Sequence, residues 1–155
     1  INQTELDLTV NALRERVGFN QKLTMTPVVD PQLEADYPNV SGANATLIRE
    51  IRRERRIELV GEGFRYDDIR RWACGKLLEA PRLGINLSIA GYTAEDEAIL
   101  REQVGVNAEG YLTPYGVRYA GMNPNPVFEE PKHYLYAIPT NEIALNPNLK
   151  QNPGW

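Results

Sequence analysis

The chain has few of the residues on which many catalytic and metal sites depend. Its 155 residues include one cysteine, Cys74, and one histidine, His133. A single histidine cannot form a multi-histidine metal site and makes a Ser-His triad a poor prospect. A single cysteine cannot close an internal disulfide, so it says nothing about redox compartment. We expect no catalytic residue and no metal, with Cys74 as a small buried apolar residue and His133 as a surface or packing residue.

Other signatures are missing too. The sequence contains no glycine-rich phosphate loop, no CxxC pair and no HExxH, so it predicts no cofactor. No apolar run is long enough for a transmembrane helix, and no signal peptide precedes Leu6. The net charge of -4 and the pI of about 5.1 argue against a nucleic-acid partner, in spite of the clustered arginines.

Hydrophobic spacing predicts a mainly α-helical fold, with helices over residues 1–106. Apolar residues recur at i, i+4, i+7 and i+11 from Leu6, which predicts a helix over residues 4–17 that ends at Gly18. Residues 27–42 contain three prolines and are expected to be a loop. Further along, Thr93 opens a capping-box pattern for a helix that should reach about Val104.

Residues 107–155 form a different kind of sequence. Glycine and proline recur every few residues, so short extended segments and loops are expected there. Residues 134–138 should be extended, and Pro139 should open a short last helix that ends before Pro147. The sequence therefore predicts a helical part followed by a loop-rich part within residues 1–155.

The most informative stretch is the charged segment from Leu47 to Trp72. On a helix, the face that carries Leu47 and Ile51 continues with charged residues, and Gly61 and Gly63 then separate it from a second helix. An unpaired buried ion costs several kcal/mol, so the two helices must pair their charges. We predict a structural ion-pair network made of Glu54, Arg55, Glu58, Glu62, Arg65 and Asp68.

Four other arginines lie on the opposite side of the first of these helices. They are Arg49, Arg52, Arg53 and Arg56, and we expect water to hydrate them. An alternative interpretation of the same cluster makes two of its carboxylates a general acid and a general base. Ion-pair networks also perturb pKa values, so the structural interpretation is preferred.

Several ordered motifs resemble those of a known family. Residues 11–18 resemble N-x-x-R-x-R-A-G, with Val17 in place of the alanine. Residues 54–72 resemble the series ER-x-x-EL, EG-x-R and DL-x-RW, and residues 138–155 resemble a closing motif. Together these motifs resemble the SusD/RagB family of outer-membrane nutrient-binding lipoproteins of Bacteroidetes.

The resemblance implies tetratricopeptide-like helix pairs and a role in nutrient uptake rather than catalysis. Such proteins sit at the cell surface, capture an oligosaccharide or another nutrient, and deliver it to a SusC-like TonB-dependent transporter. The chain would correspond to the C-terminal portion of a family member, with the lipidated cysteine that anchors it upstream of Ile1. Alternatives from other classes are a carboxylate-based hydrolase and a helical protein-protein interaction module without a small ligand.

Candidate ligand contacts lie in the loop-rich span from residue 92 to residue 125. Sugars stack on aromatic faces and take hydrogen bonds from planar polar side chains at their ring edges. The candidates with this chemistry are Tyr111, Tyr115, Arg118, Tyr119 and Asn123, with Tyr92 as a weaker one. The alternative is that these tyrosines only cover the core and keep their hydroxyl groups in water.

Overall fold

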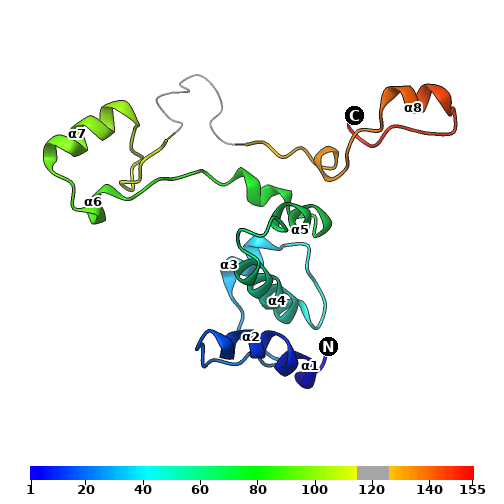
Figure 1. Cartoon of the computed structure of the whole chain (residues 1–155), viewed down its shortest axis with the longest axis horizontal. Helices are drawn as coiled ribbons and strands as arrows, with labels where there is room; N and C mark the ends of the chain where they lie inside the picture. Colours follow the sequence, from blue (N-terminus) through cyan, green and yellow to red (C-terminus); the bar gives the residue numbers. More distant parts are fainter. Residues whose placement is uncertain (115–125) are drawn as a thin grey trace. The chain divides into compact units, whose positions relative to one another are not determined.

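The computed structural model of the chain describes residues 1–114 and 126–155, and these are mainly helical (Figure 1). The chain divides into two compact units. The first unit consists of residues 1–75 and 131–155, and the second consists of residues 76–130. Each unit is described by itself below.

The first unit contains most of the α-helices. They are α1 (Gln3–Leu8), α2 (Val10–Arg16), α3 (Pro31–Asp36), α4 (Ala45–Glu58), α5 (Arg65–Arg71) and α8 (Thr140–Leu145). The 3-10 helix η2 (Lys132–Tyr134) precedes α8 and contacts α5. The helix predicted over residues 4–17 is present but breaks at Thr9, whose φ of -121° and ψ of -91° are not helical. The last helix begins after Pro139 as predicted.

The helix α3 corrects the prediction of a continuous loop over residues 27–42. The Asp30 side chain accepts hydrogen bonds from the backbone N–H groups of Gln32 and Leu33, and Pro31 occupies the first turn. An aspartate N-cap followed by proline is a helix-start signal, because proline lacks the N–H that would be unsatisfied there. The segment was predicted as a loop because its three prolines disfavour a helix.

The two helices predicted around the glycines are confirmed as α4 and α5. Helix α4 ends at Glu58, and Gly61 and Gly63 follow with φ of 81° and 85°. Glycine adopts such positive φ values without the steric cost that a side chain brings. The turn allows the chain to begin α5 at Arg65.

The core of the first unit gathers side chains from segments that are distant in sequence. Leu6, Val10, Leu23 and Leu47 form one buried cluster, against which Met25 and Ile51 pack. Residues of α1, α2 and α4 thus share one apolar core. Tyr37 is fully buried after α3, and Cys74 is buried after α5 as the sequence predicts.

The second unit contains α6 (Leu87–Ala90), α7 (Ala94–Gln103) and most of the 3-10 helix η1 (Gly75–Glu79). Thr93 caps α7 by accepting a hydrogen bond from the Asp96 backbone, and the helix ends at Gln103 with Val104 as its C-cap, close to the predicted end. Short extended pairings follow, because Val106 faces Leu112 in an isolated β-bridge. This agrees with the expected short extended segments.

No helix in the described part of the chain is long and apolar enough to cross a membrane.

Candidate functional site

One group of buried charges in the first unit surrounds Arg14 of α2. The Arg14 Nε donates to Glu54 Oε1 at 3.0 Å, and its Nη2 donates to the same oxygen. Its Nη1 donates to the backbone oxygen of Gln21 at 2.8 Å, and the Glu50 carboxylate lies 3.9 Å from Nη2. One guanidinium group therefore ties α2 to α4 and to the segment that follows α2.

Glu50 is the second buried charge of this group, with only 4% of its surface exposed. Arg53 donates to it from the next turn of α4 and also pairs with Asp30 at 3.0 Å. Burial raises the pKa of Glu50 above its ordinary value, and the attraction of Arg53 and Arg14 offsets this only in part. The carboxylate is therefore costly to ionise and depends on both arginines.

Asp68 of α5 is the third buried charge. Arg55 Nε donates to one of its oxygens at 2.8 Å and Arg71 Nε donates to the other at 2.8 Å. Burial alone would raise the pKa of Asp68, but the hydrogen bonds from the two arginines outweigh it and lower the pKa below the ordinary value. The Arg55 to Asp68 pair connects α4 with α5.

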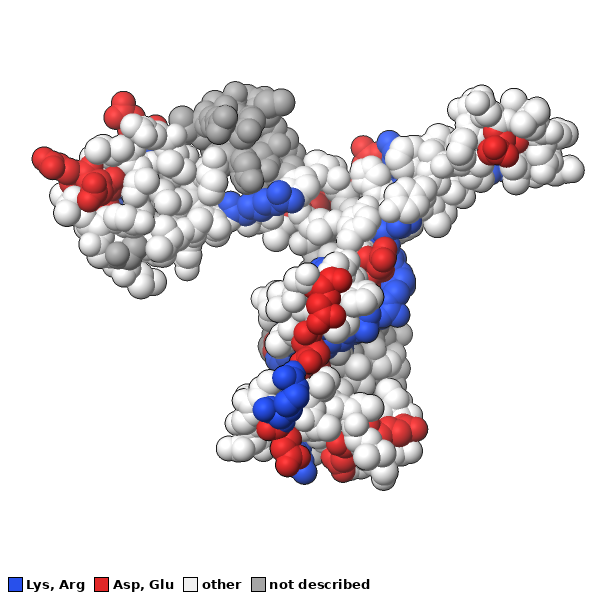
Figure 2. Space-filling model, in the orientation of Figure 1, with Lys and Arg blue, Asp and Glu red and all other residues white. Residues whose placement is uncertain are grey.

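The remaining members of the predicted network lie nearer the surface. Glu58 accepts two hydrogen bonds from Arg16 at 2.8 and 2.9 Å, with both side chains partly exposed. The expectation that Glu62 is buried is wrong, because α4 ends before it and leaves it exposed in the turn. Within residues 1–114 and 126–155, the hydrogen bond of the Arg65 side chain goes to the Tyr37 hydroxyl, at 3.4 Å. Figure 2 shows acidic and basic side chains gathered together over α2 and α4.

The structure corrects the expectation that the arginines on the other side of α4 are hydrated. Arg49 is buried and donates to Glu34 at 2.8 Å and to the backbone oxygens of Tyr37 and Val40. It faces α3 and the chain after it, which the sequence analysis treated as a loop. Of the four arginines, Arg56 fits the expectation best, since 41% of its side chain is exposed.

Arg52 is also held inside the first unit, by aromatic rings. Its guanidinium carbon lies 4.7 Å from the Trp72 ring centre and 5.2 Å from that of Tyr37, and these two rings meet edge to face at 6.0 Å. The negative faces of the rings attract the cation. Burial lowers the pKa of Arg52 below its ordinary value. Trp72 thus packs against Arg52 and Tyr37.

Residue patterning did not predict Arg14, Glu50 and Arg49 as buried charges. A signal for Glu50 was present, because it lies three residues after Leu47 and four before Glu54, on the same helical face. For Arg14 the signal was its place between Val10 and Val17 on the apolar side of α2. Arg49 could not be found without recognising α3.

A cleft of about 490 Å³ lies beside this network in the first unit. Residues of the chain after α2 line it, among them Phe19, Lys22 and Val28, and so does Arg53 of α4. The Arg14 guanidinium lies 5.2 Å from the Phe19 ring centre, so one face of that ring is covered. The volume falls within the range of about 300–1,000 Å³ that small-molecule sites occupy.

Comparison with known proteins identifies the family. The model of the SusD family matches residues 2–155. The chain belongs to the SusD family. A search of curated proteins and a search of solved structures find no significant match. Proteins of the SusD family act in nutrient uptake by binding glycans or other nutrients, are binding proteins rather than enzymes, and are typically associated with the cell surface at the outer membrane.

The ligand contacts expected for this SusD-family chain fall mostly outside the described residues. Tyr111 is described and half-buried, and its backbone N–H donates to the Asn107 side chain at 2.8 Å. The other candidates, Tyr115, Arg118, Tyr119 and Asn123, lie within residues 115–125, outside the described part. Their role as ligand contacts stays a prediction.

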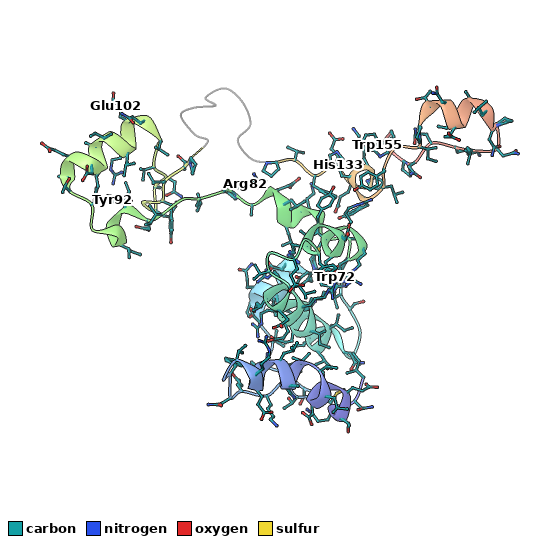
Figure 3. All side chains as sticks on the ribbon, in the orientation of Figure 1. Trp72, Arg82, Tyr92, Glu102, His133 and Trp155 are labelled. Atoms are coloured by element: carbon teal, nitrogen blue, oxygen red, sulfur yellow. The ribbon has the colours of Figure 1, made fainter. Side chains whose placement is uncertain are left out.

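Two further expectations concern metals and the single histidine. Among the residues that the structure describes, no three histidine, cysteine, aspartate or glutamate side chains are grouped to hold a metal ion. His133 lies beside Trp155, with ring centres 6.3 Å apart (Figure 3). The Trp155 Nε1 donates to the backbone oxygens of Lys132 and Leu135. These contacts give His133 a packing neighbour at the end of the chain.

Proposed function

We propose that this chain is the C-terminal portion of a cell-surface protein that binds a glycan or another nutrient and delivers it to a SusC-like TonB-dependent transporter. The match of the SusD family model to residues 2–155 carries this proposal. A lipid anchor outside these residues would hold the protein at the outer membrane. The helices of residues 1–106 would be arranged as tetratricopeptide-like pairs, followed by the loop-rich residues 107–155.

The loop-rich part is the proposed place of ligand contact. Tyr111, Tyr115 and Tyr119 supply aromatic faces, while Arg118 and Asn123 supply planar hydrogen-bonding groups. Aromatic faces stack on the C–H groups of sugars, and planar polar groups satisfy their hydroxyls. This combination supports an oligosaccharide as the ligand.

The carboxylates of the first unit support a structural role better than a catalytic one. Glu54 and Asp68 each accept two hydrogen bonds from arginine, and Glu50 accepts one from Arg53. A general acid or base needs a proton-transfer path to a substrate, and its carboxylate must change charge during each cycle. Carboxylates that neutralise buried arginines do not meet this requirement, which disfavours the hydrolase alternative.

A glycan array tests the binding proposal. The chain is expected to bind at least one oligosaccharide class, and alanine at Tyr111, Tyr115 or Tyr119 is expected to weaken that binding by about tenfold, since stacking contributes on the order of 1 kcal/mol. Tyr66→Ala is the matched control, because Tyr66 is an exposed tyrosine of α5. Unchanged binding by all three variants would show that the ligand contacts lie elsewhere. The cleft beside Phe19 would then be tested next.

The transporter is tested separately. When the protein that carries this chain is purified from outer membranes in mild detergent, a TonB-dependent transporter is expected to accompany it. A protein that binds glycan but never co-purifies with a transporter would remove the delivery step and leave the binding function.

A further inference from the structure

A smaller cavity of about 210 Å³ lies in the first unit where α4 ends and α5 begins. Arg55 and Arg56 line it from α4, Arg65 and Asp68 line it from α5, and Phe64 lies between them in sequence. Phe64 is 45% exposed and gives the cavity an apolar wall. Three arginine residues thus line the same small space, together with the apolar residues Leu59 and Val60.

The single carboxylate in this lining is already neutralised. Both oxygens of Asp68 accept arginine hydrogen bonds at 2.8 Å, one from Arg55 and one from Arg71. The two arginines hold the pKa of Asp68 below its ordinary value, so it stays ionised and does not act as a hydrogen-bond donor. Three arginines and one carboxylate line the cavity, and Asp36, outside the lining, pairs with Arg56, so the lining keeps an excess of positive charge.

Two of the three arginines already have acidic partners. Arg55 uses its Nε on Asp68 and lies over the Phe64 ring, with its guanidinium carbon 5.7 Å from the ring centre, and Arg56 forms an ion pair with Asp36 at 3.6 Å. Arg65 makes only the 3.4 Å contact with the Tyr37 hydroxyl, and no ion pair joins it to a carboxylate in the described residues. The free donors of a guanidinium group form a planar fork that matches the two oxygens of a carboxylate or sulfate.

We propose that this cavity binds an oxyanion that the ligand carries, the carboxylate or sulfate group of an acidic saccharide. The excess charge attracts the anion, the arginine forks bind its oxygens, and Phe64 packs against the sugar ring. The proposal rests on the nutrient-binding function and narrows it, because it adds a preference for acidic over neutral saccharides. Two other acidic residues close in sequence, Glu62 of the turn and Asp67 of α5, do not line the cavity.

Isothermal titration of the whole protein at constant ionic strength tests this inference. The probes are a galacturonate oligosaccharide, a neutral oligosaccharide of equal length, and sodium sulfate. The main variant is Arg65→Gln, because removing the charge of Arg65 leaves no described carboxylate without its partner. The matched control is Arg101→Gln, an exposed arginine on α7 that pairs with Glu97 within its own helix.

The acidic oligosaccharide is expected to bind more tightly than the neutral one, and Arg65→Gln should weaken its binding by at least about tenfold, as for the loss of a charged hydrogen bond. Arg65→Lys should restore part of the affinity, and Arg101→Gln should change nothing. Equal binding of the acidic oligosaccharide by the Arg65→Gln variant and the unchanged protein would overturn the proposal. So would sulfate binding as tight as that of the oligosaccharide, because the site would then serve a free ion.

The same titrations separate this inference from the nutrient-binding function. Binding of the neutral oligosaccharide with no preference for the acidic one overturns the oxyanion cavity and supports the function. Binding of sulfate that is lost in Arg65→Gln, without binding of any saccharide, supports the cavity as an anion site but overturns the saccharide as its ligand and counts against the function.

Discussion

Different kinds of interaction stabilise the interior of each of the two units. In the first unit, side-chain charges connect segments that are far apart in sequence, as Arg14 does with Glu54 across 40 residues. In the described part of the second unit, the ion pairs are local, such as Glu97 with Arg101. Residues 84–87 meet residues 110–112 through backbone hydrogen bonds, and the side chains of Lys76 and Glu79 bond the Phe128 backbone rather than a distant charge. Leu112, for example, exchanges backbone bonds with Gly84 and Ile85.

This difference shows which kind of change each unit will tolerate. A unit stabilised by buried ion pairs depends on side-chain identity, because loss of one partner leaves the other buried and unpaired. A unit stabilised by backbone hydrogen bonds tolerates most side chains but depends on close approach of the main chains. The first unit should therefore be broken by charge substitutions, and the second by added side-chain bulk.

The largest effect is expected for Arg14→Ala in the first unit. The substitution leaves Glu54 and Glu50 without their shared arginine, and the free energy of unfolding should fall by about 3–5 kcal/mol. Urea denaturation followed by circular dichroism measures it. Arg16→Ala is the control, because its pair with Glu58 is exposed and should contribute only about 0–1 kcal/mol. Equal losses for the two variants would contradict the distinction between buried and surface pairs.

A smaller effect with a characteristic pH dependence is expected for Asp68→Asn. Removal of the carboxylate leaves Arg55 and Arg71, which are partly exposed and can be hydrated, so the loss at pH 7 should be about 1–3 kcal/mol. The folded-state pKa lies below the ordinary value of 3.8, so Asp68 stabilises the fold above that pH. This stability is lost as the pH falls through the lowered pKa.

Denaturation curves at several pH values between 2 and 7 test the sign. The difference in stability between the unchanged protein and Asp68→Asn should shrink as the pH falls below 3.8. A difference that stays constant down to pH 2 would mean that the pKa of Asp68 is not lowered by its arginines.

The second unit is tested by Gly84→Ala. An added Cβ would lie 2.9 Å from the Cβ of Leu112, closer than side chains approach each other, so the paired backbones must separate. We expect a loss of about 1–3 kcal/mol, as for overpacking in a core. Hydrogen exchange should accelerate at the Gly84 and Leu112 amides, while the amides of α4 keep their protection. Accelerated exchange only in α4 would contradict the idea that the backbone pairing at Gly84 stabilises the second unit.

Residue patterning predicted the helices of both units well but predicted the partners of the charges poorly. The apolar spacing of α2 and the glycine turn after α4 are local signals. They predicted the helices, and they predicted that Arg55 and Asp68 belong to one ion-pair network. The partners of Arg14 and Arg49 depend on how α2 and α3 pack on α4, which no local pattern contains. Because α3 was not predicted, Arg49 was expected to be hydrated.

The candidate ligand contacts show a related limit. The type of residue that binds a sugar can be recognised in sequence, as with Tyr111 and Arg118. The cavity at Arg65 depends instead on the direction that two helices take after the glycine turn. The sequence predicts that Arg55 and Arg65 lie on neighbouring helices. It does not predict that both residues line the same cavity.

The central claim is that buried arginine and carboxylate pairs between helices hold the first unit together. A double-mutant cycle with Arg14→Met and Glu54→Leu tests it most directly, with unfolding free energies measured in urea for both single variants and the double variant. The account predicts a coupling energy of about 2 kcal/mol or more, because each single change strands a charge that the double change removes. Additive losses, with a coupling near zero, would contradict it.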